Sequence, residues 1–170
     1  MAIIWSGALG ILLVLLSSVP ALAAAAPPPE PDLIRYEAMG CFFYCPVFVV
    51  SVDRDGRGLF EGRRHTAVQG PRRFRMSPAQ FKAFASELEP LRPEAGSVRY
   101  DHDTRCGGAG VPVTDGASTN VAWRSGQSRQ FLHFYSGCPQ RDVERGLREA
   151  MGLLPIKAFI GEACLLGRCS

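Results

Sequence analysis

The sequence predicts an α+β domain with a mainly antiparallel sheet, built from two hairpins and an N-terminal strand and cross-linked by disulfides. Two strand–turn–strand patterns are each followed by a helical pattern, and this order is typical of an antiparallel sheet with helices packed against it. Each strand pattern has one apolar face, so we expect the two helices on one face of the sheet. Six cysteines behind an apolar N-terminus favour disulfides, because exported proteins meet an oxidising environment.

Residues 1–23 have the pattern of a secretory signal peptide. An uncharged apolar run at 8–16 is followed by Ala-Leu-Ala at 21–23, and a short apolar core before an A-x-A site is typical of such signals. No Lys or Arg precedes the run, so an uncleaved membrane anchor is the alternative. Cleavage leaves an Ala/Pro leader at 24–31 and a single domain at 32–170. We therefore expect a secreted or periplasmic protein without a membrane span.

An N-terminal strand and the first hairpin follow the leader. Residues 32–37 alternate between the two faces of a short strand. Residues 47–52, VFVVSV, are rich in β-branched and aromatic side chains and form the clearest strand pattern of the chain. The Asp-Gly pair at 55–56 predicts a turn, and residues 58–62 then return as the second strand.

A second hairpin and two amphipathic helices complete the expected fold. The hairpin joins residues 118–124 to residues 129–135. The first helix begins at Ser77, which caps it, and ends before Pro90. The second helix begins near Pro139, and both helices carry apolar residues at helical spacing. These apolar positions are Phe81, Phe84, Ala85 and Leu88 in the first helix, and Val143, Leu147, Ala150, Met151 and Leu154 in the second.

Six cysteines allow fifteen pairings, and the sequence does not choose among them. A bond between Cys106 and Cys138 would close a loop of about 33 residues around the second hairpin and contribute roughly 3–4 kcal/mol. The cysteines that we expect in disulfides are Cys41, Cys45, Cys106, Cys138, Cys164 and Cys169.

The stretch CFFYCP at 41–46 has three interpretations. The favoured one is structural, either a bond between Cys41 and Cys45 or bonds from each to a distant partner. Four residues of extended strand span about 13 Å, so a bond between these two requires a bend at 42–44. The second is a redox dithiol, although such sites have two residues between the cysteines. The third is copper held by both thiolates and His133, because thiolates and imidazole suit Cu(I). The favoured interpretation needs no cofactor.

Five arginines form a basic cluster between the first hairpin and the first helix. We expect a solvated loop there, with anion binding as the alternative, because Arg guanidinium groups bind phosphate and carboxylate bidentately. The candidate anion-binding residues are Arg63, Arg64, Arg72, Arg73 and Arg75.

The charge and the absence of catalytic motifs limit the function. The formal net charge of +3 is too small to favour nucleic acid as a partner. The sequence has neither a G-x-S-x-G nor an H-E-x-x-H motif, which favours a binding or structural module of the cell envelope over an enzyme. The partner is left open between an anionic envelope component and another protein.

Several of these motifs together resemble a bacterial family of unknown function, domain of unknown function 6438. Its pattern is C-F-x-x-C-P before an aromatic strand, an Asp-Gly turn, a strand with Gly, a helix, and a Thr-Asp pair before a late hairpin. The matching segments lie at 41–46, 55–57, 60–62, 77–88 and 114–115. The resemblance covers about residues 33–152 and implies a small exported α+β domain, without an activity or catalytic residues.

Overall fold

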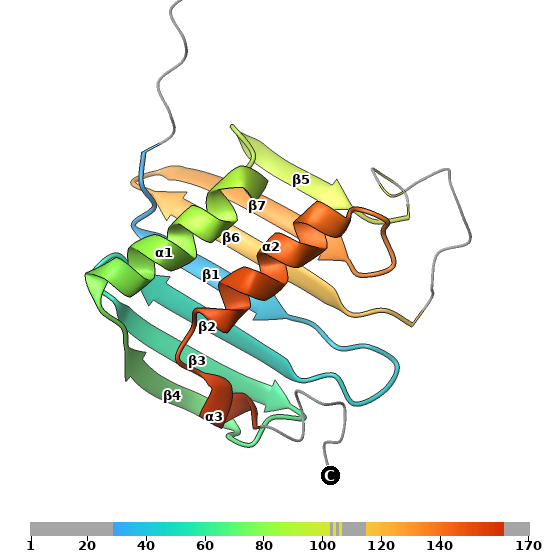
Figure 1. Ribbon diagram of the computed structural model, residues 1–170, viewed down its shortest axis with the longest axis horizontal. Coiled ribbons are helices and arrows are strands. Elements are labelled where there is room, and N and C mark those ends of the chain that lie inside the picture. The colour runs from blue at the N-terminus through green and yellow to red at the C-terminus, as the bar shows by residue number, and fades with distance from the viewer. Residues whose placement is uncertain (1–28, 103, 105, 107–114, 162–170) are drawn as a thin grey trace, which may run out of the picture.

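Seven strands form one sheet in the order β4-β3-β2-β1-β6-β7-β5 (Figure 1). The computed structural model describes residues 29–102, 104, 106 and 115–161. The expected signal peptide, Cys164 and Cys169 lie outside these residues. The strands are β1 (Leu33–Ala38), β2 (Val47–Asp53), β3 (Arg57–Arg64), β4 (Gly70–Arg75), β5 (Gly96–Tyr100), β6 (Ser118–Ser125) and β7 (Ser128–Tyr135).

The predicted α+β class and mainly antiparallel sheet are confirmed, since every strand pair except β5 with β7 is antiparallel. The Asp-Gly turn between β2 and β3 is also present. Gly56 has a φ of 74°, and a side chain there would collide with the carbonyl oxygen of Met76. This close approach fixes glycine at the turn.

Two strands were not predicted, and both are edge strands. β4 has the sequence GPRRFR, with mostly exposed residues and no alternation of apolar side chains. β5 is short and lies parallel to β7 at the opposite edge. Charged residues and proline are common on edge strands, because one side of the strand needs no partner. The predicted hairpins and N-terminal strand therefore form the centre of a wider sheet.

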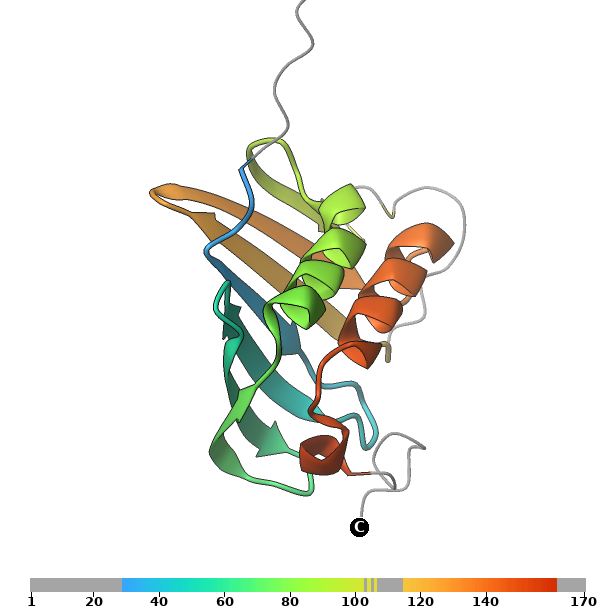
Figure 2. The same cartoon turned by 60° about the vertical axis from the view of Figure 1, so that its left-hand side comes forward.

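The helices α1 (Pro78–Leu88) and α2 (Arg141–Gly152) lie side by side across one face of the sheet (Figures 1 and 2). Phe81, Phe84 and Leu88 of α1 are buried there. Ser77 caps α1 as predicted, because its hydroxyl accepts from Gln80 N–H and the Gln80 side chain accepts from Ser77 N–H.

Short helices η1 (Glu89–Leu91) and α3 (Lys157–Ile160) end the two helical regions. The ring of Phe159 in α3 lies 5.5 Å from that of Phe60 in β3, so α3 extends the core toward the β4 edge. Within the described ranges, no helix is long and apolar enough to cross a membrane.

A buried arginine joins the start of the domain to the second hairpin. The Arg92 side chain is 1% exposed. Its guanidinium donates to the carbonyl oxygen of Pro29 at 2.9 Å, and to Ser125 Oγ and Gln130 Oε1 at 3.1 Å each. These bonds hold the N-terminal segment, the end of η1 and the β6–β7 hairpin together.

Candidate functional site

The sheet face opposite the helices is open, since no described helix lies on it (Figure 2). Alternate residues of each strand point to this face, and antiparallel pairing aligns them in rows across the sheet. The row nearest the two hairpin turns is Arg75, Arg57, Asp53, Leu33, Arg124 and Arg129. The next row is Arg73, Leu59, Ser51, Arg35, Ala122 and Phe131. The two rows bring together six arginines and one aspartate.

Carboxylates neutralise part of this charge. Arg57 donates to Asp53 at 2.7 Å and to Asp55 at 2.8 Å, and its hydrogen bond to the Asp53 carboxylate is the main cause of the raised pKa of Arg57. Burial alone would raise the pKa of Asp53, but the hydrogen bonds from Arg57 outweigh it and hold this pKa below its usual value.

Glu37 neutralises two further arginines, at 2.9 Å each from Arg35 and Arg63. Burial would raise the pKa of Glu37, but hydrogen bonds from Arg35 and Asn120 and the nearby charges lower it. Glu37 is therefore ionised at neutral pH, and both arginines are paired.

Four arginines of the open face form no ion pair with the described residues: Arg73 and Arg75 on β4, Arg124 on β6 and Arg129 on β7. The pKa of Asp32 is lowered mainly by the hydrogen bond that its carboxylate accepts from Gly126 N–H. The charge of Arg124 also contributes to this lowering. These four arginines stand at two flanks of the sheet, separated by β1, β2 and β3. We call the four side chains and the apolar surface between them the arginine face.

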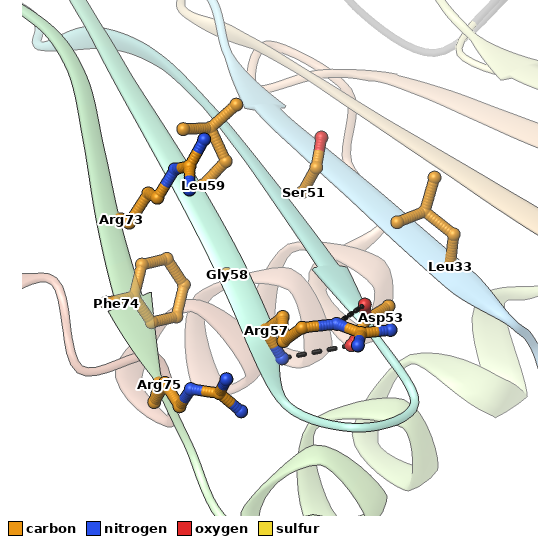
Figure 3. A pocket seen from close by; sticks show the side chains of 9 residues that line it. All are labelled: Leu33, Ser51, Asp53, Arg57, Gly58, Leu59, Arg73, Phe74 and Arg75. Carbon is orange, nitrogen blue, oxygen red and sulfur yellow. Dashed lines mark hydrogen bonds and ion pairs between the residues drawn. The ribbon is translucent and has the colours of Figure 1, made fainter.

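Two shallow hollows lie between the flanks and meet at Leu33. Figure 3 views the larger one, of about 530 Å³, with the helices behind the sheet. It is lined by Leu33, Ser51, Asp53, Arg57, Gly58, Leu59, Arg73, Phe74 and Arg75. The smaller one, of about 330 Å³, is lined by Leu33, Arg35, Ala122, Trp123, Arg124, Arg129, Gln130 and Phe131. The two hollows share Leu33, and each also has apolar side chains in its lining, such as Leu59 and Phe131.

The five arginines predicted as a cluster lie on two neighbouring strands and do not all face the same side of the sheet. The expected solvated loop is wrong, because Arg63 and Arg64 belong to β3 and the other three to β4. Arg73 and Arg75 face the open side. Arg72 stands opposite Phe60 in the β3–β4 register, and because Phe60 faces the core, Arg72 points to the helix side. Arg64 lies beside Gly40, in the space that a side chain there would fill.

The structure joins Cys41 to Cys45 and Cys106 to Cys138. The Cα atoms of Cys41 and Cys45 are 5.5 Å apart, so residues 42–44 bend as a bond between these two requires. The second bond, between Cys106 and Cys138, encloses the second hairpin. Both indicate an oxidising, extracellular type of environment.

The copper alternative combined Cys41 and Cys45 with His133. His133 Nδ1 lies 2.8 Å from Asn120 Oδ1, on the open face of β7. Burial, followed by the charge of Arg99, lowers the pKa of His133, and Asp101 partly opposes this. Among the described residues, no three His, Cys, Asp or Glu side chains are grouped to hold a metal ion. The two sulfurs bond each other, so copper and redox roles stay predictions about the reduced protein.

The five-residue ring closed by Cys41 and Cys45 contributes modestly to stability. Replacing both cysteines by serine should lower the free energy of unfolding by about 2 kcal/mol, because so small a loop restricts the unfolded chain little. Urea unfolding of the variant beside the unmodified protein measures this. A loss of about 4 kcal/mol or more would instead assign the ring a role in holding the core.

The fold and these surfaces place the chain among small disulfide-linked α+β domains. It belongs to the family described as Domain of unknown function (DUF6438), whose model matches residues 32–152. The C-F-x-x-C motif that resembled this family is the disulfide ring of the structure. No curated protein and no solved structure matches the chain.

Proposed function

We propose that this protein is an exported, disulfide-stabilised module that binds an anionic polymer of the cell envelope through the arginine face. The observation that carries the proposal is the pair of arginine flanks. Arg73 and Arg75 stand on one flank, Arg124 and Arg129 on the other, and none forms an ion pair with a carboxylate of the described residues.

The chemistry of these side chains favours anions. A guanidinium binds carboxylate, sulfate or phosphate through two parallel hydrogen bonds. Binding at an arginine that is already paired would first break that pair, whereas these four offer their donors directly. They are therefore better candidates than Arg35, Arg57 and Arg63, which carboxylates hold.

The spacing of the flanks favours a linear polymer over a small ion. β4 and β6 are four strand spacings apart in the sheet, or about 19 Å at 4.8 Å per spacing. No small anion reaches both flanks, but a chain with repeated negative charges does. Leu33 and Leu59 between them suit the apolar parts of a sugar backbone.

The compartment favours an acidic envelope polymer over nucleic acid. Two disulfides suit an oxidising environment, where nucleic acid is rarely met. Single-stranded nucleic acid is usually bound by stacking its bases on exposed aromatic rings. Three aromatic residues line the two hollows: Phe74, Trp123 and Phe131. Trp123 is fully buried and the other two are half-buried, so none offers a fully exposed ring for stacking.

Binding to immobilised polygalacturonate and to dextran sulfate tests the proposal with carboxylate and sulfate separately. R73Q/R75Q and R124Q/R129Q should each weaken binding about tenfold, equivalent to about 1.4 kcal/mol per flank. The matched control is R141Q/R148Q, which removes the same charge from exposed positions of α2 on the helix side. Equal losses in the control and the flank variants would mean that binding follows net charge and not this surface.

A further inference from the structure

The β1–β2 connection carries the most exposed large apolar side chains in the described part of the chain. Phe42 is 75% exposed, Phe43 68% and Tyr44 56%, ahead of Leu59, Leu153 and Met39. The three are consecutive and lie inside the Cys41–Cys45 ring. We call residues 41–45 the aromatic tip. The largest exposed apolar patch of a soluble domain is often a functional one.

The three rings lie away from the core, in the short loop that the disulfide closes. The ring of Phe42 packs edge-on against that of Phe43, with centroids 5.2 Å apart. The ring of Tyr44 packs in the same way against His65, at 5.3 Å. Phe42 N–H donates to the carbonyl oxygen of Asp115, which fixes the base of the tip. The tip is thus shaped before any partner arrives, and a preorganised loop loses little entropy on binding.

Polar groups surround the base of the tip. The guanidinium of Arg64 lies over Gly40, immediately before Cys41. His65 stands beside Tyr44, and Asn120 donates to the sulfur of Met39. Apolar rings at the end of a loop with polar and cationic groups behind them match the layering of a lipid surface. There, aromatic side chains sit among the headgroups and Arg side chains reach to the phosphates.

The apolar area is small for a protein partner. At about 200 Å² for a fully exposed aromatic side chain, the three rings expose about 400 Å². A standard protein interface needs about 800 Å² on each partner. We propose that the aromatic tip inserts its rings into a lipid–water interface, which needs no complementary shape. This inference is independent of the arginine face.

A fluorescent side chain at the tip tests insertion directly. The chain has two tryptophans, Trp5 and the 1% exposed Trp123, so W5F/F43W places one responsive indole in the tip. With phosphatidylcholine vesicles containing phosphatidylglycerol, its emission should shift to shorter wavelength and be quenched by lipids brominated in the acyl chains. Vesicles of phosphatidylcholine alone should give a smaller shift, because their surface has no net negative charge to attract Arg64.

The matched control is W5F/L59W, which places the indole on the open sheet face. The emission of the indole reports only on its own surroundings. A chain held at the vesicle by its apolar N-terminal residues therefore still shows whether the tip inserts. Emission from the tip that ignores the vesicles and stays open to aqueous acrylamide would overturn the proposal. The same would follow if the L59W indole shifted and was quenched as strongly as the F43W indole.

Discussion

Replacing Cys106 and Cys138 together by alanine should lower the free energy of unfolding by about 3–4 kcal/mol, the largest effect that we expect from any single cross-link. The bond closes a loop with a sequence separation of 32 that contains both strands of the second hairpin. Without it, the unfolded chain gains the freedom of that whole loop. Cys138 is also buried, 4% exposed, so its sulfur contributes packing at the start of α2.

Urea unfolding measures this loss, and the serine variant of Cys41 and Cys45 is its control. Substitution removes one cross-link at a time, whereas reduction would break Cys41–Cys45 and Cys106–Cys138 together. The long loop should cost about twice as much as the five-residue ring, because loop entropy grows with the logarithm of loop length. Equal losses in the two variants would contradict the assignment of Cys106–Cys138 as the main cross-link.

Replacing Arg92 by alanine should lower the free energy of unfolding by about 2–4 kcal/mol. The change removes the donor of Ser125 and Gln130, which are 9% and 4% exposed, and leaves these polar groups buried without it. It also removes the shorter of two hydrogen bonds to the Pro29 carbonyl, which keeps only the 3.4 Å bond from Ser125 Oγ. Burial makes this arginine costly to remove, unlike those of the open face.

Two further variants separate the contributions in this experiment. R92M keeps most of the aliphatic volume and should lose less than R92A, because only the hydrogen bonds and charge are removed. R75A changes an exposed arginine on β4 and should stay within about 0.5 kcal/mol of the unmodified protein. An R92A protein as stable as R75A would show that the buried hydrogen bonds contribute no net stability.

Local patterns in the sequence predicted the centre of the fold. The β-branched and aromatic run at 47–52, the Asp-Gly turn at 55–56 and the Ser77 cap each depend on neighbouring residues, and the strand, turn and cap that they predict are all present. The edge strands were missed for a physical reason. β4 and β5 form because β3 and β7 offer open hydrogen-bonding edges, and the residues of β4 show no pattern of their own.

The arginine face was predicted only in part, because cross-strand register assembles it. Arg73 and Arg75 were named as anion-binding candidates, but Arg124 and Arg129 were not. The last two flank the second hairpin turn, and register pairs them on the open face. Their separation from β4 in the sequence hides a relationship that only the strand order reveals.

The cysteines show the same limit. The sequence required a bend if Cys41 and Cys45 were to pair, but it could not choose among fifteen pairings. The choice depends on Cys106 lying next to Cys138, just before α2, which is a tertiary contact. The exposure of Phe42, Phe43 and Tyr44 was likewise hidden, since aromatic residues beside a strand are usually buried.

The most direct test of the arginine face is the salt dependence of binding to a linear polyanion of defined length. The affinity of the unmodified protein for polygalacturonate should fall steeply with salt, because each arginine contact releases counterions from the polymer. R73Q/R75Q/R124Q/R129Q should give a much flatter slope, and oligomers shorter than about 19 Å should bind no more tightly than a single flank allows. An unchanged slope in the quadruple variant, or an equal flattening in the charge-matched control R72Q/K82Q/R141Q/R148Q, would contradict the proposed binding surface.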